Sequence, residues 1–203
     1  MSLSLAWDKS DEGSTNAMID LSNRLLRGGG SALAALVVVV IGSFQVHADA
    51  LEDWQAGYDA ERAGNPSMAI EQYTNAIRSG ELNQRSLARV FRSRGNAFHA
   101  ADNNVEALND YNTAIGLDPA YTLAFVSRGV IYHEAADLER AIADYDQAAF
   151  LDPDYALTYA NRGGAYEQLG RVEEAVRDFR MAYDLGLSQE WLVETLTNYG
   201  ALP

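Results

Sequence analysis

Apolar and small residues recur at every third or fourth position from about residue 50 to residue 187. In one stretch Phe91, Gly95 and Phe98 follow this spacing, and in the next Ala107, Tyr111 and Ala114 do the same. Residues spaced in this way lie on one side of an α-helix. The pattern therefore predicts short amphipathic helices, each with one buried face, and an all-α protein.

The same pattern returns after 34 residues. The segment GLDPAY at 116–121 is followed by FLDPDY at 150–155, and three copies agree at six further positions, which are Phe91, Gly95, Phe98, Ala107, Tyr111 and Ala114, then Phe125, Gly129, Tyr132, Ala141, Tyr145 and Ala148, then Tyr159, Gly163, Tyr166, Ala175, Phe179 and Ala182. A weaker copy precedes them by 38 residues at Gly57, Ala69, Tyr73 and Ala76. We therefore predict four inserted residues near Glu81–Leu87.

This pattern resembles the tetratricopeptide repeat, which has an aromatic, a glycine, alanines and a proline at corresponding places. The resemblance implies a right-handed superhelical solenoid of about four helical hairpins with a C-terminal capping helix. The expected repeats cover about 50–83, 88–121, 122–155 and 156–187, and the cap covers about 189–199. We expect the Ser188 hydroxyl to begin the cap, and Trp191, Leu192 and Leu196 to cover the last repeat.

Two recurring features predict how each hairpin packs. Gly95, Gly129 and Gly163 lie in mid-helix, where glycine costs about 1 kcal/mol relative to alanine, so we expect them to let a second helix approach closely. Arg94, Arg128 and Arg162 occupy a position where the family usually has leucine, and each precedes an aspartate by 16 residues, namely Asp110, Asp144 and Asp178. We predict an arginine–aspartate pair across each hairpin; a ligand-binding role is the alternative.

The resemblance also implies that the first helix of each hairpin lines a concave groove that binds a protein or peptide. The candidate groove residues are Arg89, Arg92, Asn96, His99, Val126, Val130, His133, Glu134, Ala160, Gly164, Glu167 and Gln168. They describe a groove that is basic at one end, apolar in the middle and acidic at the other end. An ordinary solvated surface is the alternative. Only Arg92 and Asn96 match the clamp with which some members grip a terminal carboxylate, so we do not expect that specificity.

The amino-terminal segment predicts export. Basic residues in RLLRGGG at 24–30 precede an apolar stretch at 31–44, and Val46 and Ala48 fit a signal-peptidase site. We predict cleavage after Ala48, a repeat domain over 49–203, a periplasmic location in a bacterium, and no stable membrane span after processing. An uncleaved anchor and a buried helix are the alternatives. We interpret residues 1–17 as disordered, or as preceding a true start at Met18.

The composition and the spacing of polar residues argue against nucleic-acid binding, metal binding and catalysis. The chain has no cysteine and a net charge of −14, so it lacks thiolate ligands and the basic stripe that nucleic acid requires. His99 and His133 match in register, but adjacent helices lie about 8–10 Å apart, too far to share a zinc ion. The best carboxylate pair for a hydrolase is Glu134 with Glu167, and such pairs are common in so acidic a chain. We therefore expect no metal, no cofactor and no catalytic site.

The leading interpretation is an exported adaptor or scaffold. A structural envelope protein that self-assembles through the ends of the solenoid or the Trp54 and Tyr58 region is the alternative, and a glycan-acting hydrolase is a third, weaker one. The sequence leaves the partner and the oligomeric state open.

Overall fold

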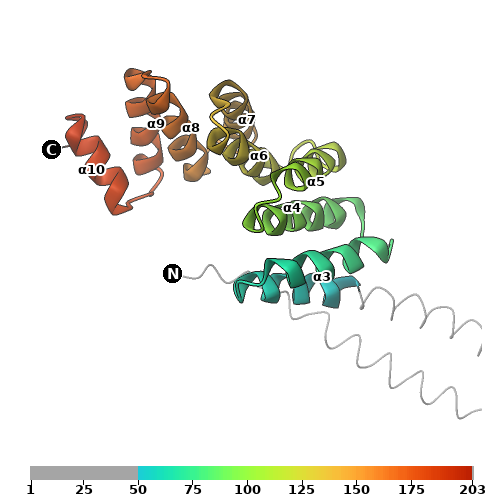
Figure 1. The fold of residues 1–203 in the computed structure, drawn as a ribbon. Coiled ribbons are helices and arrows are strands. Elements are labelled where there is room, and N and C mark those ends of the chain that lie inside the picture. Colours follow the sequence, from blue (N-terminus) through green and yellow to red (C-terminus); the bar gives the residue numbers. More distant parts are fainter. Residues whose placement is uncertain (1–49, 203) are drawn as a thin grey trace, which may run out of the picture. The chain divides into compact units, whose positions relative to one another are not determined.

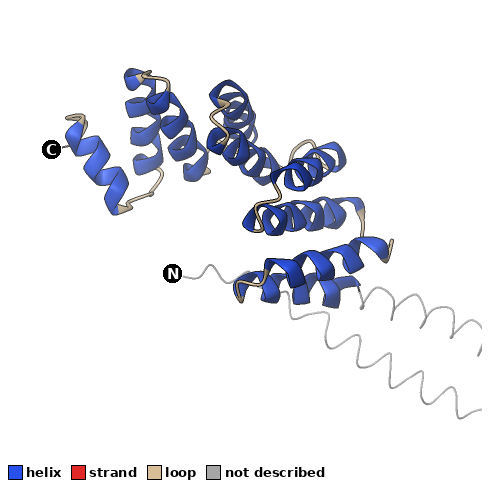
Figure 2. Cartoon of the chain, in the orientation of Figure 1, coloured by secondary structure: helices blue, strands red, loops and turns tan. Residues whose placement is uncertain are grey.

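The computed structural model describes residues 50–202, and these form helices joined by short turns (Figures 1 and 2). The first helix covers residues 50–62. The others are α3 (Pro66–Arg78), α4 (Gln84–Ala100), α5 (Asn104–Leu117), α6 (Thr122–Glu134), α7 (Leu138–Leu151), α8 (Ala156–Gln168), α9 (Val172–Asp184) and α10 (Glu190–Asn198). The predictions for the signal sequence and for residues 1–17 lie outside these residues.

The helices pair into antiparallel hairpins that follow one another in chain order. The pairs are residues 50–62 with α3, α4 with α5, α6 with α7, and α8 with α9, and α10 packs against α9. Each hairpin contacts only its neighbours, as expected of a stacked array. The prediction of an all-α solenoid of helical hairpins with a terminal helix is confirmed.

A buried aromatic ring lies at the centre of each hairpin, and a glycine on the first helix makes room for it. Tyr145 is fully buried, and a Cβ atom placed on Gly129 would lie 2.6 Å from its ring. Gly57, Gly95 and Gly163 stand in the same relation to Tyr73, Tyr111 and Phe179. The predicted close approach is confirmed, since no larger residue fits between the helix and the ring.

The four inserted residues lengthen one helix. α4 contains 17 residues and α6 contains 13. The residue that matches Thr122, the first of α6, is Ala88, and α4 begins four residues earlier at Gln84. The insertion therefore adds about one turn of 3.6 residues and leaves the register of the repeat unchanged.

The terminal helix begins differently from our expectation. Gln189, not Ser188, precedes α10, and its carbonyl accepts the Leu192 and Val193 amides. No side chain caps this helix, because the Gln189 amide oxygen instead accepts the Trp191 indole N–H at 2.6 Å. Leu192 and Leu196 are fully buried against α9, as predicted. Trp191 remains 45% exposed and meets Phe179 edge-on.

Candidate functional site

The first helices of successive hairpins lie next to one another. α4 contacts α6 and α6 contacts α8, whereas α5, α7 and α9 make no contact with one another. The first helices therefore lie on the inner side of the stack and the second helices on the outer side. We call the exposed and half-buried side chains of α4, α6 and α8 on this inner side the first-helix surface.

Ten of the twelve candidate groove residues belong to the first-helix surface. Arg89, Glu134, Glu167 and Gln168 are exposed, and Arg92, Asn96, His99, Val130, His133 and Gly164 are half-buried. The expectation is wrong for the other two: Val126 is 8% exposed and Ala160 is 5% exposed, because both pack into core clusters between hairpins. Only Val130 and Gly164 thus remain of the predicted apolar middle.

Side chains on adjacent helices bond to one another across this surface. The Arg92 Nε donates to the Ser127 hydroxyl at 3.4 Å, and His99 Nε2 lies 2.7 Å from Glu134 Oε2. At the far end, the hydroxyl of Tyr199, which directly follows the terminal helix α10, donates to Glu167 at 2.6 Å. The sequence did not single out Ser127 or Tyr199. Ser127 follows Arg92 by one repeat plus one residue, and this spacing is the only feature of the sequence from which their contact could have been predicted.

Glu134 and Glu167, the candidate catalytic pair, are each engaged by a neighbouring side chain, Glu134 by His99 and Glu167 by Tyr199. Both residues are exposed. Among residues 50–202, no group of three or more His, Asp or Glu side chains is placed to hold a metal ion. None of the helices in this range has the length and apolar character needed to cross a bilayer.

His133 has a different environment from His99. Its Nε2 atom is buried and has no hydrogen-bond partner among the described residues. Burial lowers the pKa of His133, and the nearby Glu134 carboxylate opposes this shift. The ring therefore favours the neutral form at neutral pH.

The opposite side of the first helices carries the predicted arginine–aspartate pairs, and all three are bidentate. Arg128 donates from Nε and Nη2 to Asp144 at 2.8 and 2.6 Å. Arg94–Asp110 and Arg162–Asp178 repeat this geometry at 2.6–2.9 Å. Each Nη1 also reaches the second helix of the preceding hairpin, at Thr74, Asn112 or Asp146. One arginine thus ties three helices together.

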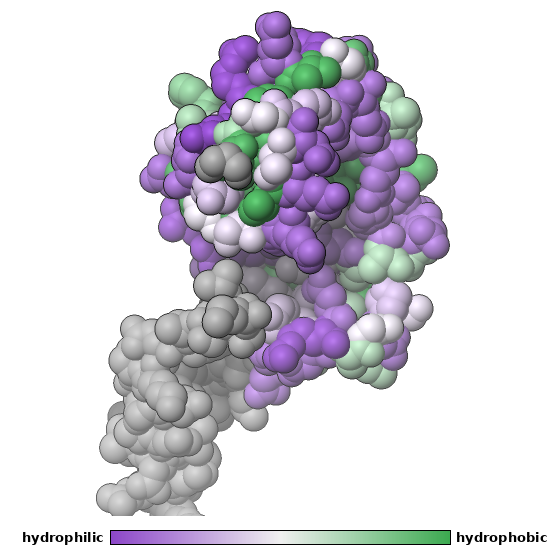
Figure 3. Space-filling model, turned by 90° about the vertical axis from the view of Figure 1, so that its left-hand side faces the viewer, coloured by the Kyte–Doolittle hydropathy of each residue, from purple (hydrophilic) through white to green (hydrophobic). Residues whose placement is uncertain are grey.

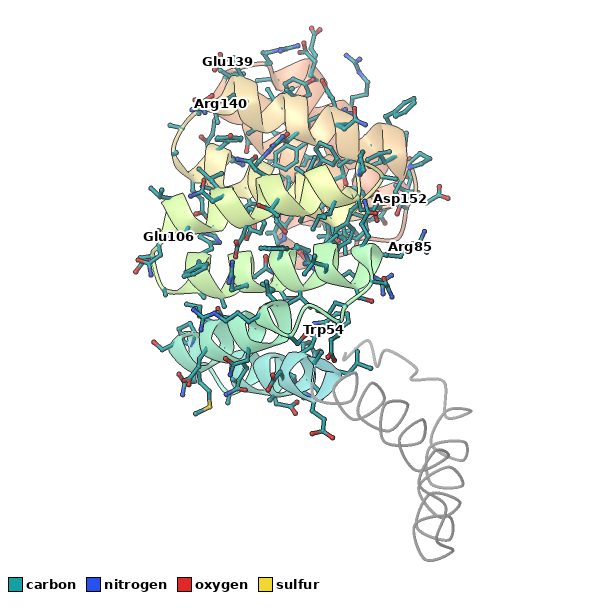
Figure 4. The ribbon with its side chains drawn as sticks, turned by 90° about the vertical axis from the view of Figure 1, so that its right-hand side faces the viewer. Trp54, Arg85, Glu106, Glu139, Arg140 and Asp152 are labelled. Carbon is teal, nitrogen blue, oxygen red and sulfur yellow. The ribbon has the colours of Figure 1, made fainter. Side chains whose placement is uncertain are left out.

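Charged side chains also mark the two edges of the stack. Figure 4 shows Glu106, Glu139 and Arg140 at one edge, where second helices begin, and Arg85 and Asp152 at the other. On the face drawn in Figure 3, hydrophilic residues predominate and hydrophobic ones form small separate patches. The face drawn in Figure 3 thus has no broad apolar patch of the kind that marks a tight protein interface.

Sequence comparison decides the family. Models described as "Tetratricopeptide repeat" match residues 55–122 and 156–185, and one described as "TPR repeat" matches residues 137–170. The chain belongs to the tetratricopeptide repeat family. No curated protein matches it in sequence.

Several solved structures of tetratricopeptide repeat proteins share the fold. MamA is 21% identical, with a TM-score of 0.60 over 89% of this chain and 96% of MamA. The Arabidopsis OM64 TPR domain is 27% identical, with a TM-score of 0.54 over 57% of this chain and 96% of that domain. The second TPR domain of human RPAP3, in complex with the HSP70 peptide SGPTIEEVD, is 29% identical, with a TM-score of 0.54 over 58% of this chain and 98% of the domain.

Proposed function

We propose that this protein is an exported adaptor or scaffold that holds a protein or peptide on its first-helix surface. The observation that carries the proposal is the variation of this surface between repeats. Matching positions hold Asn96, Val130 and Gly164, while the buried glycines and the paired arginines on the same helices repeat without change. Since the fold does not require this variation, we attribute it to recognition of a ligand.

The likeness to the RPAP3 domain supports a peptide as the ligand. That domain binds an HSP70 peptide, and it is similar to this chain over a stretch as long as three hairpins. Extended peptides suit a surface made of parallel helices, because each helix offers its own set of side chains to successive residues. The particular peptide is not carried over, since only Arg92 and Asn96 match the carboxylate clamp.

The charges of the first-helix surface favour an acidic group in the ligand near α4. Arg92 makes one hydrogen bond, from Nε to Ser127, and its two Nη groups have no partner among residues 50–202. Arg89 is exposed one turn away. A guanidinium with free N–H groups is suited to a carboxylate. An acidic side chain or terminus of the ligand therefore meets Arg89 and Arg92, and an apolar side chain lies over Val130 and Gly164.

Affinity measurements with surface variants test this function. A partner captured by crosslinking in the native envelope is titrated into wild-type protein and into the Arg92→Glu and Val130→Asp variants. Both substitutions introduce a negative charge on the first-helix surface, so each is expected to weaken binding at least tenfold, which corresponds to about 1.4 kcal/mol. Glu106→Gln, on the outer side, serves as the control. Undiminished affinity in both variants rules out this surface.

Export rests on the segment before Asp49 and has its own test. Amino-terminal sequencing of protein from the periplasmic fraction is expected to begin at Asp49. A mature chain that begins upstream of Asp49, or that stays in the membrane fraction, contradicts the proposed cleavage.

Self-assembly is the alternative, and Tyr58 is the residue of the Trp54 and Tyr58 region that is exposed enough to take part. Trp54 packs against the core of the first hairpin, whereas Tyr58 is 41% exposed on the same helix. Molecular mass measured in solution over a range of concentrations separates the two functions. A mass that stays that of one chain favours the adaptor, and a mass that rises with concentration and falls in Tyr58→Ser favours assembly.

A further inference from the structure

The buried tyrosines of successive hairpins find different partners for their hydroxyl groups. Tyr73 donates to Glu61 at 2.9 Å, and Tyr111 donates to Asn96 at 2.8 Å. Both acceptors lie on the first helix of the same hairpin, at positions three residues apart in the repeat. The hydroxyl group thus lies within reach of either position.

The third hairpin has neither a carboxylate nor a side-chain amide at these two positions. Val130 matches Asn96, and His133 matches Glu61. Tyr145 is fully buried, and its hydroxyl has no hydrogen-bond partner among the described residues. The fourth hairpin has no unpaired hydroxyl at this position, because Phe179 replaces the tyrosine. An unpaired buried hydroxyl is destabilising, so its retention in one hairpin calls for a reason.

His133, which stands at the position of Glu61, carries a second unpaired polar atom. Its Nε2 is also buried without a partner among the described residues. In the first hairpin the matching pair, Tyr73 and Glu61, is hydrogen-bonded at 2.9 Å, so the repeat brings the His133 and Tyr145 side chains near each other. A Cβ atom on Gly164 would lie 3.3 Å from the His133 ring, so this ring lies at the boundary of α6 and α8.

We propose that Tyr145 and His133 together bind an amide group of the partner, whose carbonyl accepts from the tyrosine O–H and whose N–H donates to His133 Nε2. A neutral imidazole supplies this acceptor, and Val130 and Gly164 surround the site with apolar atoms that strengthen both hydrogen bonds. Both polar atoms are covered in the free protein, so entry requires the half-buried His133 ring to turn. Gly164 has no side chain to hinder that turn. The inference rests on the proposed function, since it assumes that the partner lies on the first-helix surface.

Small amides test the site without the partner. N-methylacetamide represents a main-chain peptide group, acetamide represents an asparagine or glutamine side chain, and methyl acetate has the carbonyl but no N–H. Each is titrated into the full-length protein while the ¹⁵N signals of the His133 ring are followed by NMR. We expect a saturable shift with one or both amides and none with methyl acetate. The amide with the lower dissociation constant identifies the source of the group.

Two variants copy residues from other hairpins and are therefore expected to fold. Val130→Asn supplies the acceptor that Asn96 provides to Tyr111, and Tyr145→Phe copies Phe179. Each is expected to weaken amide binding at least fivefold, and Val130→Asn is also expected to raise the melting temperature. Shifts that do not saturate, that are equal in the variants, or that are equal with methyl acetate overturn the proposal. So does a direct hydrogen bond between Tyr145 and His133 that the amides leave unchanged.

Different experimental results would contradict the amide site and the proposed function. Loss of amide binding with intact partner binding at Arg92 removes only the amide site. Partner binding that Arg92→Glu and Val130→Asp both leave unchanged removes the proposed function itself.

Discussion

The two sides of α4, α6 and α8 differ in how closely their residues repeat from one hairpin to the next. On one side, each helix carries the same arginine, which bonds to the same aspartate and reaches the preceding hairpin. On the other side, matching positions hold residues as different as His99 and Glu167. A position whose side chain joins two hairpins in this way therefore holds the same residue in each of these helices. A position without such a contact holds different residues.

The first hairpin shows where the arginine side begins. Ala56 and Gln72 occupy the places of the arginine and the aspartate, so this hairpin has no such pair of its own. Arg94 of the next hairpin still reaches back to it through the Thr74 hydroxyl at 3.1 Å. The arginine therefore both braces its own hairpin and joins it to the one before it.

Replacing one of the repeated arginines is the strongest test of the difference between the two sides of the first helices. Arg128→Leu leaves Asp144 with a buried, unpaired charge, and we expect a loss of about 3–5 kcal/mol of unfolding free energy in urea denaturation. Replacing both Arg128 and Asp144 with leucine serves as the control and should lose much less. Unchanged stability of Arg128→Leu combined with lost partner binding would mean that the arginine serves the ligand.

The packing glycines are expected to be nearly as sensitive. Gly129→Ala brings a Cβ atom to 2.6 Å from the Tyr145 ring, and we expect a loss of about 1–3 kcal/mol in the same measurement. The matched control is Gly116→Ala on α5, where nothing lies within 4 Å of the new methyl group. The control should gain up to about 1 kcal/mol from its helix propensity. Equal effects at the two glycines would contradict the packing role.

Removing a tyrosine hydroxyl should have opposite effects in two neighbouring hairpins. Tyr111→Phe deletes a hydrogen bond to Asn96 and should lower the free energy of unfolding by about 1 kcal/mol. Tyr145→Phe deletes an unpaired buried hydroxyl and should raise it by about 1 kcal/mol. Thermal melts of the two variants check this. A loss in both would show that Tyr145 already has a partner.

The smallest expected effect is a dependence of stability on pH through His133. Because burial lowers its pKa in the folded protein, the unfolded chain takes up a proton first, at the ordinary pKa of about 6.5. Stability should therefore fall as the pH drops from 6.5 toward the lower folded pKa. Comparing wild type with His133→Asn at pH 7.5 and pH 5 isolates this contribution. An identical pH dependence in both proteins would assign it to other groups.

Much of the core followed from the sequence because each hairpin repeats the same contacts. The glycine and the aromatic ring that meet lie a fixed number of residues apart in all four copies, and the arginine and aspartate that pair do so in the last three. The candidate surface was harder to predict. Val126 and Arg92 match in the repeat, yet Arg92 is half-buried at the surface and Val126 packs into the core. Exposure at that position depends on how adjacent hairpins meet, which the repeat does not encode.

The sequence by itself determined the family, the hairpins, the packing glycines and the arginine–aspartate pairs, since all of these are contacts within one repeat and recur with its period. Only the tertiary structure showed which surface residues bond across the boundary between repeats, such as Arg92 with Ser127 and Glu167 with Tyr199. It also showed that the Tyr145 hydroxyl lacks a partner. These features arise where two helices far apart in the chain meet, and a repeating pattern of single positions carries no information about that meeting.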